Sequence, residues 1–482
     1  MSEKNDLKTK TVSNLFWRFA ERCGAQGVAF VVSIVLARML SPEDYGLIAL
    51  VTVFTSILQV FVDNGLGNAL IQKKDADDMD FSTAFYANVA FCLVLYIISY
   101  LAAPLVAKFY NNDSLTGIFR VLCLTVLISG VKNIQQAYVS RNMIFRKFFF
   151  ATLIGTIGAA VIGIFMAYHG YGVWALVAQQ VFNTLIDTIV LWISVKWRPK
   201  RMFSMKRLKV MFDYGWKLLA SSLITTVYND IRQLIIGRVY SAEDLAYYNK
   251  GKQFSDVVVV NINASIDSVL LPVLSENQDD KTRVRELTRR SIKISSYIMW
   301  PLMFGLMAVG EPFIELILTE KWLPCVPYLY IFCFTNGIMP IQTANLNAIK
   351  AMGRSDLYLK LEIIKKTGGI LLILAFMNHG VLALGISCVI YSLYAGLVNT
   401  YPNKKLLGYS VIDQLKDILP SLGLAAAMAV IVYYLPLSSL HLVWQLIIKV
   451  IAGAAIYVGG SVLFRIDSFQ IVLGIVKNFL KR

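Results

Sequence analysis

The sequence predicts an all-α polytopic membrane protein with about fourteen transmembrane helices. Hydrophobic residues make up 57% of its 482 residues and charged residues only 16%, and the mean hydropathy is +0.61. Soluble proteins are far more polar, with about 25% of their residues charged. Apolar runs recur along the whole chain, and a run of about 20 residues is long enough to cross the bilayer hydrocarbon as a helix.

The apolar runs divide the chain into a series of predicted spans. The first run follows polar residues and has no small-residue cleavage site after it, so we expect it to stay in place as a signal anchor. The tail 469–482 is apolar with a basic end. This pattern is compatible with two structures, an interfacial helix and a frayed terminus. The predicted spans cover residues 12–36, 45–70, 84–106, 115–139, 148–168, 173–195, 211–239, 254–274, 292–318, 327–349, 357–377, 381–401, 415–435 and 442–464.

Lysine and arginine are distributed unevenly between alternate loops. The loops on the N-terminal side of the membrane hold most of them, whereas the opposite loops carry isolated cations such as Arg38, Lys108, Lys250 and Lys321. The positive-inside rule therefore predicts a multi-pass protein of the cytoplasmic (inner) membrane with both termini cytoplasmic. The net charge of +16 then reflects topology and attraction to anionic membrane lipids, and no nucleic-acid partner is expected. The basic segments are residues 4–10, 73–74, 141–147, 196–209 and 281–290.

A polar motif occurs twice, at the turn after the first predicted span and at the turn after the seventh. The pattern Arg-x-x-Ser-x-Glu-Asp begins at Arg38 and again at Arg238. Ser41 and Ser241 are predicted N-caps, because a serine side chain can accept a hydrogen bond from the backbone N–H groups that begin a helix. The acids that follow suit the positive end of the helix dipole. The motif itself is therefore explained by helix capping, and its recurrence indicates a duplication.

The duplication predicts the domain organisation. A second landmark agrees with it, since His169-Gly170 between spans five and six is echoed by His379-Gly380 between spans eleven and twelve. Because each copy has an even number of spans, the copies share one orientation and are related by an axis along the membrane normal. We expect two parallel six-helix bundles. The predicted parts are an N-terminal lobe over 1–200, a C-terminal lobe over 201–406, and a last helix pair with an amphipathic tail over 407–482.

The first motif carries a family resemblance. Residues 36–47, Leu-Ala-Arg-Met-Leu-Ser-Pro-Glu-Asp-Tyr-Gly-Leu, together with Asp-Asn-Gly-Leu-Gly at 63–67, resemble Wzx-type flippases of the multidrug/oligosaccharidyl-lipid/polysaccharide exporter superfamily. Within that group the chain is similar to exporters for capsule, colanic acid and teichuronic acid. The resemblance implies a V-shaped, two-lobed protein that flips an undecaprenyl-diphosphate-linked oligosaccharide by alternating access. It implies partners of the same assembly machinery, including a polysaccharide polymerase.

Cations inside the predicted spans are the candidate substrate-binding residues, because a diphosphate needs positive charge and a charge at a helix centre costs about 2.5–3.5 kcal/mol. Arg18, Glu21 and Arg22 share one face of the first span, and Lys217 is the repeat partner of Arg18. The alternative for these residues is snorkelling to the inner interface. The candidate cavity cations are Arg18, Arg22, Lys217, Arg232 and Lys132.

Acids inside the spans are candidates for ion coupling. A coupled transporter needs a carboxylate that binds H⁺ or Na⁺, but interhelical salt bridges would explain the same residues. No other cofactor is expected, and the spacing of the cysteines and histidines predicts no metal site. The acids are Glu21, Asp63, Asp187, Asp230, Asp256 and Asp267.

Three other functions compete with flipping. An ion-coupled multidrug exporter of the same superfamily would favour acidic and aromatic cavity residues, whereas arginine and lysine favour an anionic substrate. A membrane enzyme that acts on lipid-linked sugars needs a large outer loop, and the longest outer turn predicted here, 240–251, carries no catalytic pair. The chain is therefore not expected to be an enzyme. A scaffold would leave the embedded charges in both halves unexplained.

Overall fold

The fold is built from helices alone in the part of the chain that the structure, a computed structural model, describes: residues 24–63, 65–437 and 440–480. The chain divides into two compact units, unit 1 (Met1–Ala246) and unit 2 (Tyr247–Arg482). The boundary between the units falls near the start of α10 (Ala242–Glu276). The predicted all-α polytopic membrane fold is confirmed.

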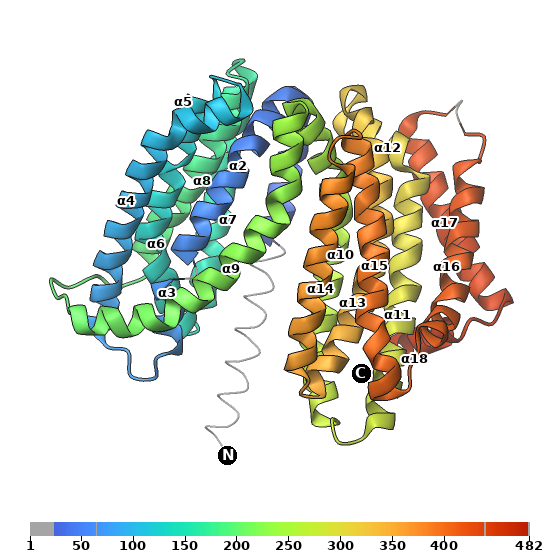
Figure 1. The fold of residues 1–482 in the computed structure, drawn as a ribbon. Helices are drawn as coiled ribbons and strands as arrows, with labels where there is room; N and C mark the ends of the chain where they lie inside the picture. The colour runs from blue at the N-terminus through green and yellow to red at the C-terminus, as the bar shows by residue number, and fades with distance from the viewer. Residues whose placement is uncertain (1–23, 64, 438–439, 481–482) are drawn as a thin grey trace. The chain divides into compact units, whose positions relative to one another are not determined.

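Unit 1 is a bundle in which helices distant in sequence lie side by side (Figure 1). The helices α7 and α8 form a tight antiparallel pair, α4 packs along α6, and α9 packs against α2 and α4. The last contact places α9 in unit 1, although the repeat puts it at the start of the second lobe; the lobes 1–200, 201–406 and 407–482 stay predictions. The helices of unit 1 after Gly24–Met39 are α2 (Pro42–Asp63), α3 (Leu66–Gln72), α4 (Asp78–Tyr110), α5 (Leu115–Leu122), α6 (Leu124–Arg141), α7 (Phe145–Tyr168), α8 (Val173–Ser194) and α9 (Met205–Val239).

Unit 2 is organised around α11 and α13, which pack on one another (Figure 1). The helix α11 also packs on α16, α13 packs on α15, α14 lies along α15, and α17 contacts α16. After α10, the elements are α11 (Lys281–Ala308), α12 (Gly310–Leu318), the 3₁₀ helix η1 (Glu320–Cys325), α13 (Val326–Ala351), α14 (Ser355–Phe376), α15 (Val381–Leu407), α16 (Val411–Tyr433), α17 (Leu442–Leu463) and α18 (Asp467–Leu480).

The described helices account for the predicted spans with two kinds of difference. Ten described helical segments, three of which join two neighbouring elements, are long and apolar enough to cross a membrane, and the bent pair α11 and α12 makes an eleventh. The helices α9 and α14 form at the seventh and eleventh predicted spans but are not among these ten. The first predicted span is described only over Gly24–Met39. The tail contributes to α18, a helix of 14 residues, and its position at the membrane interface stays a prediction.

Two details of the predicted loops are wrong. The turn expected over 240–251 shrinks to Tyr240 and Ser241, because α9 runs to Val239 and α10 begins at Ala242. The basic segment 281–290 is part of α11 instead of a loop. In both places a helix continues past the apolar run, since charged residues can extend a helix beyond the bilayer hydrocarbon.

The repeated motif forms the same helix cap in both copies. Ser41 Oγ accepts from the backbone N–H of Asp44 at 3.1 Å and donates to the Asp44 carboxylate at 2.8 Å. Ser241 does the same with Asp244, at 3.0 and 2.7 Å. The prediction of two N-caps is confirmed, and each acid reaches back to its own cap as in a capping box.

The backbone of α2 closely approaches the first residue of α10 at a glycine. A Cβ atom on Gly46 would lie 2.0 Å from the carbonyl oxygen of Ala242, the first residue of α10. The obstacle is backbone and cannot rotate away, so this contact requires glycine. Ala242, inside the second copy of the motif, therefore lies against a glycine two positions after the first copy.

Candidate functional site

An interhelical ion pair in unit 1 joins two of the predicted site residues. Lys132 of α6 lies 2.9 Å from a carboxylate oxygen of Asp187 of α8, and the two side chains are only 15% and 13% exposed. The pair also packs close to α7, since a Cβ on Gly155 would lie 3.0 Å from the Asp187 Cβ. Each charge thus neutralises the other between two apolar helices. This is the salt-bridge arrangement that was the alternative for Asp187, and the transport role of Lys132 stays a prediction.

The predicted charges on α9 occupy different environments. Asp230 accepts hydrogen bonds from Ser56 Oγ of α2 at 2.6 Å and from Gln233 at 3.2 Å. Arg232 is partly buried two positions further along, whereas Lys217 is exposed. At the end of α2, Asp63 is exposed and accepts from Gln59 at 3.1 Å. The structure therefore ties Asp230 to α2 and leaves the Lys217 ammonium accessible.

The two predicted acids of unit 2 form matching contacts between α10 and α13. Asp256 accepts a hydrogen bond from the Asn336 amide at 2.9 Å, and Asp267 accepts one from Asn347, also at 2.9 Å. Within the described ranges, neither carboxylate takes part in an ion pair. Both acids are therefore held by neutral amides at positions that the helix repeat places on one face of α10.

Three of the predicted site residues, Arg18, Glu21 and Arg22, lie outside the described residues. For the chain that is described, no three histidine, cysteine, aspartate or glutamate side chains are grouped so that they could hold a metal ion.

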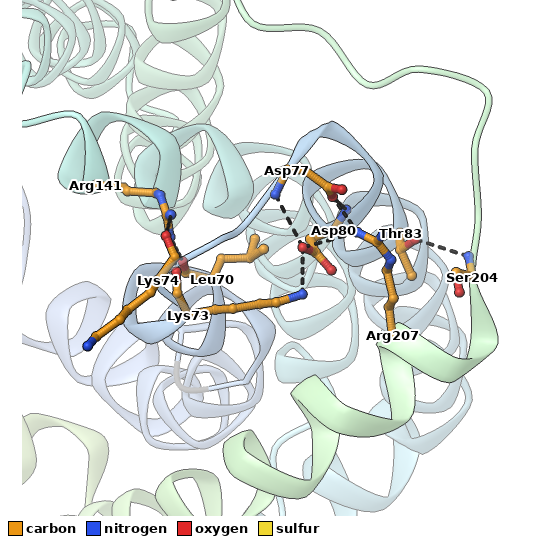
Figure 2. A network of polar contacts seen from close by, with 9 residues as sticks. All are labelled: Leu70, Lys73, Lys74, Asp77, Asp80, Thr83, Arg141, Ser204 and Arg207. Carbon is orange, nitrogen blue, oxygen red and sulfur yellow. Dashed lines mark hydrogen bonds and ion pairs between the residues drawn. The ribbon is translucent and has the colours of Figure 1, made fainter.

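A polar network in unit 1 ties the turn between α3 and α4 to the start of α9 (Figure 2). Asp77 caps α4 and accepts from the backbone N–H of Asp80 at 3.0 Å, while the Asp80 carboxylate accepts from the backbone of Asp77 at 3.2 Å. The fully buried Asp80 carboxylate also pairs with Lys73 at 2.6 Å and Arg207 at 3.3 Å. A hydrogen bond from Arg207 holds the pKa of the Asp77 carboxyl well below its usual range.

Neighbouring residues fix the backbone on both sides of this network (Figure 2). Arg141 donates to the carbonyl oxygen of Leu70 at 2.8 Å and to the carbonyls of Lys73 and Lys74, which directly follow α3. The backbone N–H of Ser204 donates to Thr83 Oγ1 at 3.1 Å. Part of the basic segment 196–209 is therefore held against α4. This contact fixes the start of α9 relative to α4.

Removing the Asp80 carboxylate is expected to destabilise unit 1. Asp80→Ala takes away the partner of Lys73 and Arg207 and half of the capping box, and a hydrogen bond to a charged group contributes about 1.5–3 kcal/mol. We expect a lower midpoint of thermal unfolding, measured by intrinsic fluorescence on the purified full-length protein in detergent. Asp75→Ala, at an exposed acid in the same turn, should change stability by less than about 0.5 kcal/mol. Equal midpoints for the two variants would contradict the assignment.

A second charged network, in unit 2, was not predicted from the sequence. Asp417 of α16 receives two hydrogen bonds from Arg289 of α11, at 2.6 and 2.7 Å, and one from the Tyr409 hydroxyl at 2.9 Å. Lys293, one turn after Arg289, lies 3.4 Å from the same carboxylate. Burial raises the pKa of the Tyr409 phenol well above its usual range. The only signal in the sequence was Asp417 itself, an acid in the first two turns of the predicted span 415–435. Its position in the sequence does not identify the residue that it pairs with.

Comparison with known proteins identifies the family. Residues 35–327, more than half of the chain, match the family of polysaccharide biosynthesis proteins. The chain belongs to this family. Two polysaccharide biosynthesis proteins are similar to it over most of their length. The teichuronic acid biosynthesis protein TuaB of Bacillus subtilis is 28% identical over 84% of this chain and 85% of its own. The lipopolysaccharide biosynthesis protein WzxC of Escherichia coli is 24% identical over 82% of this chain and 80% of its own. These relatives confirm the resemblance to Wzx-type exporters.

Solved structures with little sequence similarity share the fold of this polysaccharide biosynthesis protein. The inward closed conformation of the lipid II flippase MurJ aligns with a TM-score of 0.75 at 16% identity, over 94% of this chain and 99% of its own. An inward-facing multidrug resistance MATE family transporter of the MOP superfamily aligns with a TM-score of 0.63 at 14% identity, over 80% of this chain and 94% of its own. The chain therefore shares the fold of these two structures.

Proposed function

We propose that this chain is a flippase that moves an undecaprenyl-diphosphate-linked oligosaccharide across the cytoplasmic membrane for the export of a surface polysaccharide. The observation that carries the proposal is similarity over more than 80% of the chain to TuaB and WzxC, whose names assign them to teichuronic acid and lipopolysaccharide biosynthesis. The transporter fold supports it. Alternating access between two lobes, both termini in the cytoplasm, and contacts with a polysaccharide polymerase and assembly proteins belong to the same proposal.

The candidate cations fit the chemistry of such a substrate. A lipid-linked sugar brings a diphosphate and a polar glycan that must leave water, while its apolar tail stays in lipid. Arginine binds phosphate oxygens through two parallel hydrogen bonds, which suits Arg18, Arg22 and Arg232 to the diphosphate. The exposed ammonium of Lys217 adds a cation on α9. Lys132 contributes less positive charge in this arrangement, because Asp187 neutralises it.

The acids of unit 2 are the proposed coupling residues for H⁺ or Na⁺. Asp256 and Asp267 accept hydrogen bonds from neutral amides, so a cation or a proton can add to each carboxylate without breaking an ion pair. Asp187 forms an ion pair with Lys132, and Asp230 accepts hydrogen bonds from Ser56 and Gln233. Glu21 and Asp63 remain further candidates.

A multidrug exporter of the same superfamily is the second candidate function. The alignment with a MATE transporter supports the shared fold but gives no information about the substrate. The predominance of arginine and lysine among the candidate cavity residues favours an anionic substrate over a cationic drug. An enzyme is not proposed, because the residues of 240–251 include no catalytic pair.

The test is to replace the candidate cations in a strain that lacks the natural gene. Arg18→Ala, Arg22→Ala and Lys217→Ala are each expected to slow transport about tenfold to a hundredfold, because a charge-assisted contact contributes about 1.5–3 kcal/mol. Lipid-linked oligosaccharide retained in the inner leaflet and finished surface polysaccharide are measured together. Retention should rise as surface product falls.

Lys206→Ala is the matched control, since Lys206 is an exposed lysine on the same helix as Lys217, outside the predicted span. Membrane levels of all variants are matched before comparison. Normal export by all three cation variants would make these residues interfacial anchors. If loss of the gene retained no lipid-linked sugar but changed drug tolerance, the multidrug exporter would replace the flippase.

A further inference from the structure

A pocket of about 740 Å³ in unit 2 combines cations with an apolar wall. It lies between α11, α16 and the turn that joins α17 to α18. Its charged lining consists of Arg289, Lys293, Lys416, Arg465, Asp417 and Asp467. All of these residues belong to the end of unit 2 that the positive-inside rule predicts to be cytoplasmic.

The two acids of the pocket are already neutralised by two of its cations. Asp417 is bound by Arg289 at 2.6 Å and by Lys293 at 3.4 Å, and Asp467 lies 3.3 Å from Lys293. In the described part of the chain, neither Lys416 nor Arg465 forms an ion pair. The pocket therefore carries two surplus positive charges beside a fixed Arg–Asp–Lys group.

The backbone at Arg465 is unusual for an arginine. Its φ of 50° lies in the left-handed region, which is unfavourable for residues with a Cβ and is normally occupied by glycine where a helix ends. Hydrogen bonds from the N–H groups of Arg465 and Ile466 to the carbonyls of Val462 and Ser461 close the turn after α17. Glycine would satisfy this turn better, so the turn itself does not explain an arginine that lines the pocket.

The opposite part of the pocket is apolar and follows one face of α16. Pro420, Leu424 and Ala427 line it together with Gly423, and their spacing places them on the same side of the helix as Lys416. At 1.5 Å per residue, this stripe extends about 16 Å from Lys416 to Ala427. Phe464 borders the pocket and is 70% exposed. Lys416 and the apolar stripe thus follow one another along the axis of α16, in the order of a headgroup and an acyl chain.

We propose that this pocket binds an anionic phospholipid of the cytoplasmic leaflet, with its phosphate between Lys416 and Arg465 and an acyl chain along the apolar face of α16. The phosphate adds hydrogen bonds to two cations that the protein does not neutralise. The length of the apolar stripe favours a lipid over free phosphate, because free phosphate has no apolar part to pack against it. Basic pockets between membrane helices on the cytoplasmic side are the kind of site that anionic headgroups occupy.

The test measures lipid binding to the purified full-length protein by native mass spectrometry. The probes are dioleoyl phosphatidylglycerol, dioleoyl phosphatidylcholine and inorganic phosphate. We expect one phosphatidylglycerol to bind at least about tenfold more tightly than phosphatidylcholine, a difference of about 1.4 kcal/mol. Inorganic phosphate should not displace it at equal concentration. Equal binding of the two lipids, or displacement by phosphate, would overturn the proposal.

The variant Lys416→Gln/Arg465→Gly removes both cations and relieves the left-handed backbone at 465. It should therefore fold at least as well as the wild type and bind phosphatidylglycerol at least about tenfold more weakly. Lys404→Gln/Lys405→Gln is the matched control, because it removes the same charge from exposed residues in the last turn of α15. Unchanged binding by the first variant, or an equal loss in the control, would show that Lys416 and Arg465 do not form a specific phosphatidylglycerol site.

Discussion

Gly46→Ala is expected to prevent the close approach of α2 to Ala242 and to destabilise the protein by about 3 kcal/mol or more. The added Cβ would lie 2.0 Å from the carbonyl oxygen of Ala242 and 2.3 Å from its carbonyl carbon. Both atoms are backbone at the first residue of α10, so the two backbone segments at Gly46 and Ala242 must separate. We expect little folded protein, measured as the monodisperse fraction on size-exclusion chromatography and the midpoint of thermal unfolding.

Two other glycines provide a graded control for this substitution. A Cβ on Gly237 would lie 2.1 Å from a methyl group of Leu50, and a side chain can rotate away at lower cost, so Gly237→Ala should be milder. Gly459 has nothing within 4 Å, and Gly459→Ala should be neutral or stabilising by up to about 1 kcal/mol, as alanine favours a helix. A Gly46→Ala protein as stable as the Gly459 variant would show that the close approach is absent.

Lys132→Gln is expected to cost about 3–5 kcal/mol, because it leaves the Asp187 carboxylate without a counter-charge between apolar helices. Asp187→Asn should cost a similar amount for the same reason. The double variant Lys132→Gln/Asp187→Asn should recover most of the lost stability, since it buries no charge. The measurement is a double-mutant cycle of unfolding free energies on the full-length protein. Additive losses in the double variant would show that the two residues do not interact.

The same double variant decides the role of the pair in export. Its stability makes a transport assay interpretable, with surface polysaccharide measured at matched membrane levels. Normal export would make Lys132–Asp187 an interhelical connection. Loss of export by a stable double variant would assign the charges to translocation.

The sequence was sufficient for features that depend on neighbouring residues. The caps at Ser41 and Ser241 follow from a serine and an aspartate three positions apart, which are enough to satisfy the first N–H groups of a helix. The bend at Val309 was missed, although α11 and α12 meet there at 70°. Pro312 clashes with the carbonyl four residues before it, that of Ala308, and so prevents one continuous helix. Pro301 stays inside α11, which shows why proline alone did not identify the break.

The candidate site was harder to predict, because its contacts join residues far apart in the chain. Embedded charge identified Lys132 and Asp187, but the distance of 2.9 Å between them depends on how α6 and α8 pack. Asn336 and Asn347 carry no charge and were not singled out, yet they bind Asp256 and Asp267. Hydrophobic periodicity orients a helix face toward the core without naming the helix that it meets there.

The contacts between α10 and α13 have a mechanical consequence. Asp256 and Asp267 are eleven residues apart, as are Asn336 and Asn347, so the two amide–carboxylate contacts are separated by about three helical turns. Sliding one helix along the other would separate both hydrogen-bonded pairs at once. We therefore expect α10 and α13 to move as one body in any rearrangement of unit 2 that keeps these two hydrogen bonds.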